Sequence, residues 1–326
     1  MADRQALNAT FFAFAKRDRG GVLAGATVAF AIAAAVLVAV FAALFWSSLL
    51  PLISWYGEVI RASATNDTAA IENLGFPAQF FGFFGGLLLW LFPFYILCAA
   101  YEAACLRWMI HGETEGFMGL SLAAPTWRVW GCYWMWFLLN MAFSIVMSIV
   151  MMAVMGALAV GSGGNASVTV MALPFFYLLQ YGLMIYFGVR FAPAAATTIA
   201  RRRFSFFDAW AVTKDRFWAL FGSFLLLYVG YMLVSLLLVA GWFVSVLGSS
   251  APDLGAMQDP AQFSEALTEI LGNYLRSFMQ PRNWIIIGVL QVLGLIAATV
   301  FYVAMYGVNA RAALAALEEG KIKPAA

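Results

Sequence analysis

The stretch that decides the fold is residues 22–53, VLAGATVAFAIAAAVLVAVFAALFWSSLLPLI, a run of 32 residues without a charged side chain. A helix needs about 20 mostly apolar residues to cross a bilayer, because every backbone N–H and C=O must be paired within the segment there. The run is also far longer than the apolar region of about 7–15 residues in a cleavable signal. We therefore expect it to be a first membrane span.

Five further stretches have the same character, namely residues 79–105, 129–160, 168–190, 217–247 and 284–308. The 326-residue chain is 64% hydrophobic and 10% charged, against about 45–50% and 25% in ordinary soluble domains. The net charge of +2 gives no reason to expect a nucleic-acid partner. The sequence thus predicts an all-α integral membrane protein, a single transmembrane domain over residues 1–326 with six transmembrane helices.

Most basic residues lie on one side of the predicted membrane spans. Fifteen of the 18 Lys and Arg residues fall on one side of these spans and three, Arg61, Arg276 and Arg282, on the other. The fifteen are Arg4, Lys16, Arg17, Arg19, Arg107, Arg128, Arg190, Arg201, Arg202, Arg203, Lys214, Arg216, Arg311, Lys321 and Lys323. Because Lys and Arg favour cytoplasmic connections, both termini are predicted to be cytoplasmic.

Two distant segments are similar in sequence. Residues 17–25 read RDRGGVLAG and residues 214–222 read KDRFWALFG, and a weaker copy, WRVW, occupies residues 127–130. Each copy opens an odd-numbered span. We therefore expect three pseudo-repeated helix pairs, over about residues 7–110, 117–203 and 204–315, each led by a short interfacial amphipathic helix.

The short helix predicted before the third helix pair has the clearest sequence signature. Ser205-Phe206-Phe207-Asp208 has the form of a capping box, in which the Ser oxygen accepts an unpaired backbone N–H and the acid three residues on reaches back. Aromatic residues then share a predicted helical face, typical of a helix lying on the membrane. They are Phe207, Trp210, Phe217 and Trp218, and Leu7, Phe11 and Phe14 repeat the pattern near the N-terminus.

A cluster of basic residues lies beside this predicted interfacial helix. It comprises Arg201, Arg202, Arg203, Lys214 and Arg216. Such a cluster on the cytoplasmic side of a span attracts anionic lipid at about 1 kcal/mol per residue. The alternative is that these charges only fix the orientation of the spans.

The connections on the opposite side differ in length. Residues 161–165 form a tight turn, whereas residues 249–283 carry a helix signal that begins at Asp259-Pro260-Ala261-Gln262 and ends before Pro281. The apolar stripe of this predicted periplasmic amphipathic helix comprises Phe263, Leu267, Ile270, Leu271, Tyr274, Leu275 and Phe278. It needs a partner, which can be the outer leaflet, the bundle itself or another protein.

Polar groups inside the spans are the remaining candidates for function, because they are costly in lipid. Glu102, Arg190 and Asn309 lie near span ends, and Arg190 or Arg128 can offset the charge of Glu102, in a functional site or an ion pair that only locks helices together. The deeper Asn140, Gln180 and Gln291 are expected to hydrogen-bond between helices. Pro51, Pro93, Pro174 and Pro193 either kink spans or break them around a cavity.

Residues typical of catalysis are scarce. His111 is the only histidine and lies in a predicted loop, where we expect it to be solvated. Cys98, Cys105 and Cys132 lack the spacing of a metal site or a disulfide framework. The glycines of Gly82-Phe83-Phe84-Gly85-Gly86 and Gly156 indicate close helix packing. The sequence predicts no catalytic residue, cofactor or metal.

The pattern Ala209-Trp210-x-x-Thr213-x-x-Arg216-Phe217-Trp218-x-Leu220-x-Gly222, after a span that ends Arg190-Phe191-Ala192-Pro193, resembles a known family. That bacterial membrane family is related to the membrane domain attached to some glycerophosphoryl diester phosphodiesterases. The resemblance covers most of the chain as topology. It implies a six-helix bacterial inner-membrane protein and no catalytic residue, because in fused relatives the chemistry belongs to a separate soluble domain.

Three functions remain open at this point. The first is a structural or interaction protein that docks lipid, other membrane proteins or a second copy of itself. The second is a carrier, channel or transporter accessory for a lipid-like or small apolar molecule, with a cavity lined by Asn140, Gln180 or Gln291. The third is an enzyme acting on lipid, which requires Glu102 and His111 to converge on one pocket.

Overall fold

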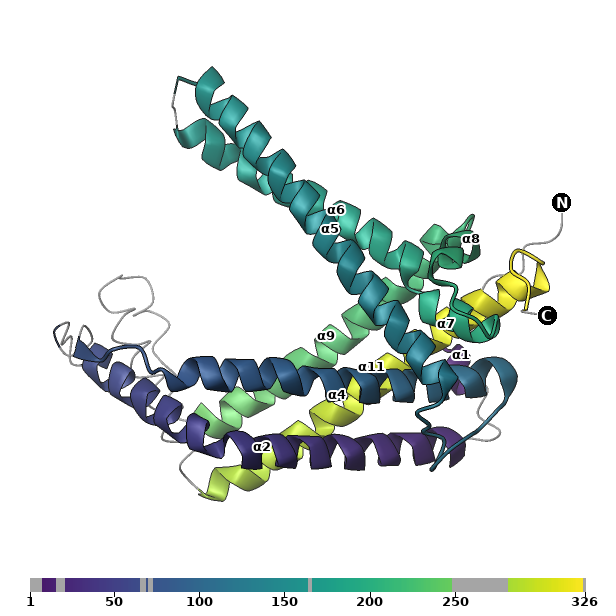
Figure 1. Cartoon of the computed structure of the whole chain (residues 1–326), viewed down its shortest axis with the longest axis horizontal. Coiled ribbons are helices and arrows are strands. Elements are labelled where there is room, and N and C mark those ends of the chain that lie inside the picture. Colours follow the sequence, from purple (N-terminus) through teal and green to yellow (C-terminus); the bar gives the residue numbers. More distant parts are fainter. Residues whose placement is uncertain are drawn as a thin grey trace. The chain divides into compact units, whose positions relative to one another are not determined.

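The computed structural model describes residues 8–15, 21–64, 69, 73–163, 166–247 and 281–324. Its main helices, in chain order, are α1 (Phe12–Ala15), α2 (Gly21–Ala64), α4 (Gln79–His111), α5 (Ala124–Gly161), α6 (Ala166–Phe191), α7 (Ala194–Ala200), the 3-10 helix η2 (Phe206–Asp208), α8 (Ala209–Thr213), α9 (Phe217–Leu247) and α11 (Pro281–Glu318) (Figure 1). Within those ranges there is no β-strand, only an isolated bridge between Phe117 and Leu120.

Six of these helices, α2, α4, α5, α6, α9 and α11, are long and apolar enough to cross a membrane. Each contains one of the intervals predicted from the sequence, so the prediction of a polytopic all-α membrane protein is confirmed. The 44 residues of α2 and the 38 of α5 exceed the ~20 that a span needs. Such helices tilt or extend beyond the hydrocarbon core. Pro51, Pro93 and Pro174 lie inside α2, α4 and α6.

The chain divides into two compact units. Unit 1 comprises Met1–Phe30, Ile96–Leu227 and Val303–Ala326, and unit 2 comprises Ala31–Tyr95 and Tyr228–Tyr302. Unit 1 therefore holds α5 to α8 entire, the beginnings of α2 and α9, and the ends of α4 and α11. The units do not coincide with the three predicted repeats, which stay a prediction.

The interior of unit 1 contains many small side chains beside larger ones such as Leu106 and Phe206. Ala99, Ala103, Ala196, Ala310 and Ala313 are fully buried, and small residues let helix backbones approach closely. α1 lies against α11 at one such approach, where a Cβ added to Gly307 would stand 2.8 Å from the backbone nitrogen of Ala13. A side chain at position 307 does not fit without displacing α1.

Unit 2 is held by aromatic contacts between α2 and α4. The Phe41 ring on α2 lies 5.8 Å from that of Phe83 and 5.5 Å from that of Trp90 on α4, and Trp90 Nε1 donates to the Leu37 carbonyl at 3.0 Å. Gly86 lies directly against the Phe45 ring, as close packing predicts. The same prediction is wrong for Gly82, Gly85 and Gly156, because an added Cβ there meets none of the described atoms within 4 Å.

The predicted lead-in helix before α9 is not one helix. Residues 206–213 form η2 and α8, Asp215 has a φ of 66°, and α9 begins at Phe217. The capping-box prediction is wrong: the Ser205 side chain makes no cap hydrogen bond, its backbone N–H donates to Thr198 Oγ1 at 3.2 Å, and Asp208 pairs with Arg201. The charge of Arg201 competes successfully for the carboxylate that the local pattern assigns to the helix start.

Of the two other predicted surface helices, one is partly described and the other is not described. Phe11 and Phe14 lie at α1, a helix of four residues, whereas Leu7 falls outside the described residues. The predicted periplasmic helix, residues 259–280, also falls outside the described residues.

Candidate functional site

Arg190, on the last turn of α6, is the centre of the best-formed polar site in unit 1. Its guanidinium carbon lies over three aromatic rings, 5.3 Å from the centre of Tyr186, 5.0 Å from Trp210 and 5.5 Å from Phe217. Such cation–π contacts attract a cation to the ring face. Tyr186 is one turn back on α6, the spacing at which helical side chains meet, whereas Trp210 comes from α8 and Phe217 from α9.

The end of α8 is fixed to the same guanidinium. Arg190 Nη1 donates to the Thr213 carbonyl at 3.0 Å, and Thr213 Oγ1 donates to the Arg190 carbonyl at 3.3 Å. The carbonyls of a last helical turn lack partners within the helix, so Arg190 satisfies one of them. Among the described residues no carboxylate lies within ion-pair distance of Arg190.

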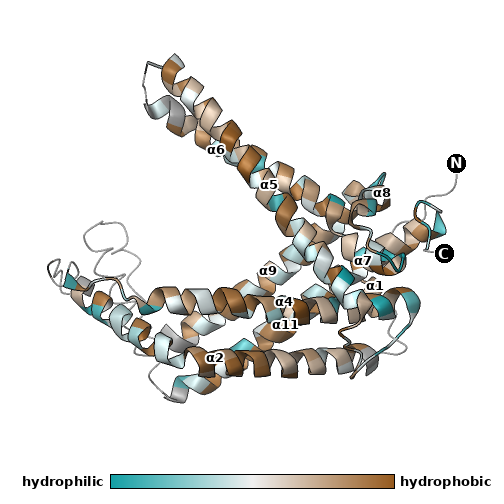
Figure 2. Ribbon diagram, viewed as in Figure 1, coloured by the Kyte–Doolittle hydropathy of each residue, from teal (hydrophilic) through white to brown (hydrophobic). Residues whose placement is uncertain are grey.

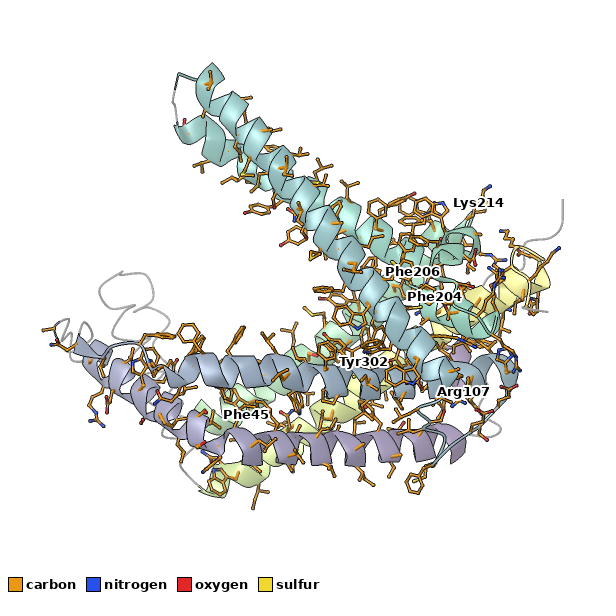
Figure 3. The ribbon with its side chains drawn as sticks, in the orientation of Figure 1. Phe45, Arg107, Phe204, Phe206, Lys214 and Tyr302 are labelled. Carbon is orange, nitrogen blue, oxygen red and sulfur yellow. The ribbon has the colours of Figure 1, made fainter. Side chains whose placement is uncertain are left out.

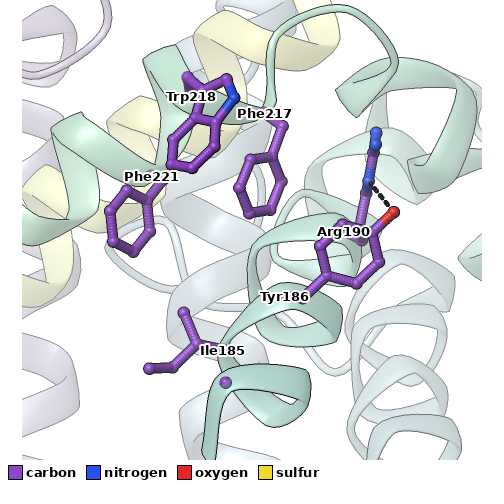
Figure 4. A pocket seen from close by; sticks show the side chains of 7 residues that line it. Ile185, Tyr186, Arg190, Phe217, Trp218 and Phe221 are labelled. Carbon is purple, nitrogen blue, oxygen red and sulfur yellow. Dashed lines mark hydrogen bonds between the residues drawn. The ribbon is translucent and has the colours of Figure 1, made fainter. Parts of the chain in front are cut away.

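A hollow of about 560 Å³ opens beside this cage, between α6 and α9. Its lining comprises Gly182, Ile185, Tyr186, Arg190, Phe217, Trp218 and Phe221 (Figure 4). Arg190 is the only charged lining residue, and Trp218 is 77% exposed. The hollow thus combines one cation with an apolar, aromatic wall.

Glu102 is placed elsewhere, in the interior of unit 1. It is 7% exposed and accepts a hydrogen bond of 2.5 Å from the hydroxyl of Tyr133 on α5. The prediction that Arg190 or Arg128 offsets its charge is wrong, because Arg190 is held by the aromatic cage and neither arginine forms an ion pair with a described residue. The hydrogen-bond partner of Glu102 is thus a tyrosine hydroxyl and not an arginine.

Asn309 on α11 is also buried. It is 7% exposed, and its Oδ1 has no hydrogen-bond partner among the described residues.

The deeper polar residues do not join helices as predicted. Asn140 Nδ2 donates at 2.8 Å to the Trp136 carbonyl of its own helix. Gln180, which is half-buried, and Gln291, which is exposed, form no hydrogen bond with any residue that the structure describes. A side chain that can bond to the preceding turn of its own helix does not need a partner helix.

The basic cluster is largely neutralised. Arg201 pairs with Asp208, Arg202 with Glu113 and Arg216 with Glu319. Arg203 and Lys214 are exposed and pair with no acid in the described part of the chain; Lys214 projects away from the ribbon in Figure 3. Of the five candidate lipid contacts, these two keep an uncompensated charge. Among the predicted interface aromatics, Phe207, Trp210 and Trp218 are exposed and Phe217 is half-buried.

His111 and the cysteines have structural surroundings. His111 ends α4 instead of lying in a loop, and its Nε2 is 3.0 Å from the Ile199 carbonyl, so the prediction of a solvated side chain is wrong. All three cysteines are free. No group of three His, Cys, Asp or Glu side chains among the described residues could hold a metal ion. Glu102 and His111 are nine residues apart on α4, about 14 Å along the axis, and contact different partners.

Sequence reasoning missed four residues. Tyr133 and Thr213 provide the partners of Glu102 and Arg190, and Tyr186 contributes a ring to the cage. Buried Arg107 pairs with Glu115 at 2.7 Å and also donates to the Gly119 carbonyl, which fixes the loop after α4 (Figure 3). Only Tyr186 had a usable signal, its four-residue spacing from Arg190.

The chain was compared with protein-family models, curated proteins and solved structures. No family model, no curated protein and no solved structure matches it. The resemblance to the membrane domain of glycerophosphoryl diester phosphodiesterases stays a prediction.

Proposed function

We propose that this chain is a non-enzymatic interaction protein of a bacterial inner membrane, which docks a helix of another membrane protein on α5. The single observation that carries this proposal is a pair of small polar residues on the exposed surface of that helix. Ser144 and Ser148 are both exposed and stand one turn apart. Small residues at this four-residue spacing are typical of helix–helix contacts in lipid, where they let backbones approach closely.

The composition of α5 and α6 supports the same proposal. These helices contain six and two of the 15 methionines of the chain, and methionine adapts to irregular partner surfaces. Hydrophobic residues cover most of both helices, with hydrophilic ones gathered around α7 and α8 (Figure 2). Large exposed apolar residues surround the two serines on α5, among them Met141, Ile145, Ile149 and Met152.

The contacts that the buried and charged side chains make support a non-enzymatic role. Glu102, Arg107, Arg201 and His111 each contact a partner that fixes local structure. A catalytic pair needs two such groups directed at one substrate. The carrier alternative has less support, because the hollow in unit 1 is lined by none of Asn140, Gln180 and Gln291.

The orientation belongs to the same proposal. The described basic residues, except Arg61 and Arg282, fall at the span ends that lie on the same side as the two termini in the predicted topology, and a cytoplasmic position of these ends agrees with the preference of Lys and Arg. The ends of α2 and α5 and the beginnings of α4, α6 and α11 are then periplasmic. Impermeant maleimide added to intact cells should label Glu58→Cys in unit 2 and spare Thr114→Cys in unit 1, with the wild-type chain as the background control. Labelling of Thr114→Cys alone would reverse the orientation.

Docking is tested with the full chain in a mild detergent. Ser144→Leu combined with Ser148→Leu should at least halve the amount of partner that is recovered stoichiometrically, because the bulky side chains separate the two helices. Ile145→Leu, a change on the same exposed surface, is the matched control and should leave recovery unchanged. Mass measurement separates a second copy from another protein. A lone monomer for the wild-type chain contradicts the proposal.

A further inference from the structure

Arg190 retains hydrogen-bonding capacity that its own protein surroundings do not use. Nη1 donates to the Thr213 carbonyl and Nε to the Tyr186 hydroxyl at 3.3 Å, whereas Nη2 bonds to no described residue. A guanidinium carries five N–H donors in a planar fork, which suits the oxygens of a phosphate. The three surrounding rings hold the plane of this fork in place, so its unused edge is oriented in advance.

The charge around Arg190 favours an anion. The nearby Arg216 is paired with Glu319, but Arg190 and Lys214 pair with no carboxylate among the residues that the structure describes. Lys214 directly follows Thr213, the residue that Arg190 contacts. Basic residues at the membrane surface attract the anionic groups of lipids. Two cations without acids therefore lie at the end of α8.

The wall of the hollow continues from the cation into the spans. On α6, Gly182 lies eight residues before Arg190, about 12 Å along the axis, and on α9, Phe221 lies one turn beyond Phe217. Figure 4 shows Trp218 and Phe221 of α9 across from Ile185 of α6. One leaflet of the hydrocarbon core is about 15 Å thick. The length and polarity of the wall thus correspond to a headgroup followed by the first part of an acyl chain.

We propose that the hollow between α6 and α9 is a binding site for an anionic phospholipid, with the phosphate on Arg190 and an acyl chain along Ile185, Trp218 and Phe221. Lys214 adds a second positive charge at the headgroup end. Trp218 lies where an amphipathic ring favours the membrane interface. This site is separate from the proposed docking surface on α5 and does not depend on a protein partner.

Native mass spectrometry of the full chain tests the site, with phosphatidylglycerol and phosphatidylcholine as probes. Wild-type protein should retain phosphatidylglycerol preferentially. Arg190→Gln should bind it about tenfold more weakly, the loss expected for one charge-assisted hydrogen bond. Lys323→Gln removes an exposed charge outside both the hollow and the basic cluster, so it is the matched control and should bind as wild type.

A second variant separates lipid binding from folding. Gly182→Leu fills the apolar end of the hollow without removing any contact of Arg190, because nothing described lies within 4 Å of an added Cβ there. It should weaken phosphatidylglycerol binding while leaving the elution volume and melting temperature unchanged. Wild-type binding by both Arg190→Gln and Gly182→Leu overturns the proposal. Displacement of the lipid by inorganic phosphate alone also overturns it, because the acyl chain then contributes nothing.

Discussion

Units 1 and 2 are made from the same kinds of helix but have different interiors. Among the described residues, those that are almost fully buried lie in unit 1, with the exceptions of Ala62, Gly86 and Asn283. Unit 1 also contains every ion pair between described residues. Unit 2 relies on ring contacts such as Phe41 with Trp90 and Tyr231 with Phe301, whose centres are 4.7 Å apart.

The difference shows what lipid does for a protein. Between helices in a bilayer there is no hydrophobic driving force, since lipid tails are as apolar as the side chains. Exposed leucine and valine in unit 2 need no protein cover there. Unit 1 contains most of the described charged residues, and charges must be paired or hydrated. A packed interior with ion pairs at its surface follows from that requirement.

The largest expected effect concerns the small-residue core. Ala313→Leu adds three carbon atoms to a fully buried position of unit 1, and overpacking of this kind costs about 3 kcal/mol. Ala240→Leu makes the same change at an exposed position of α9 in unit 2 and should be close to neutral. Thermal melting in detergent measures both. Equal melting temperatures of the two variants would contradict the difference between the units, because lipid-like detergent would then also solvate the interior of unit 1.

A smaller effect is expected for the hydrogen bond to Glu102. Tyr133→Phe removes the hydroxyl that donates to this buried carboxylate, and losing a hydrogen bond to a charged group costs about 2 kcal/mol. Tyr228→Phe in unit 2 removes a hydroxyl from a 55% exposed ring and serves as the control. A Tyr133→Phe protein as stable as this control would mean that the hydroxyl contributes nothing to the unit 1 interior.

The smallest effect is expected inside unit 2. Trp90→Phe removes the donor to the Leu37 carbonyl, and hydrogen bonds within membrane spans contribute only about 0.6 kcal/mol. Trp46→Phe makes the same replacement at a 54% exposed indole of α2. It controls for the change from an indole to a phenyl ring. The difference between the two melting temperatures should be small but measurable. A difference as large as that for Tyr133→Phe would make unit 2 dependent on polar contacts as well.

Sequence reasoning located the elements well and their contacts poorly. The spans followed from apolar runs such as residues 22–53, because each residue adds to that signal independently of its neighbours. The capping box at Ser205 failed because Arg201, four residues earlier, takes Asp208. The predicted pairing of Glu102 with an arginine was wrong because Glu102 points to Tyr133 on α5, whereas Arg190 on α6 points to Trp210. Sequence gives the depth of a side chain in the bilayer but not the direction in which it points.

The sequence by itself determined the six spans, the sorting of basic residues and the scarcity of groups for catalysis, since these depend on composition and on distance along the chain. Only the tertiary structure decided that Arg190 lies in a cage of Tyr186, Trp210 and Phe217 beside a hollow, and that Glu102 is held by Tyr133. The physical reason is that helix rotation is set by packing against neighbours. A rotation of one residue, about 100°, turns a side chain from one neighbour to another without changing the hydrophobicity of the span.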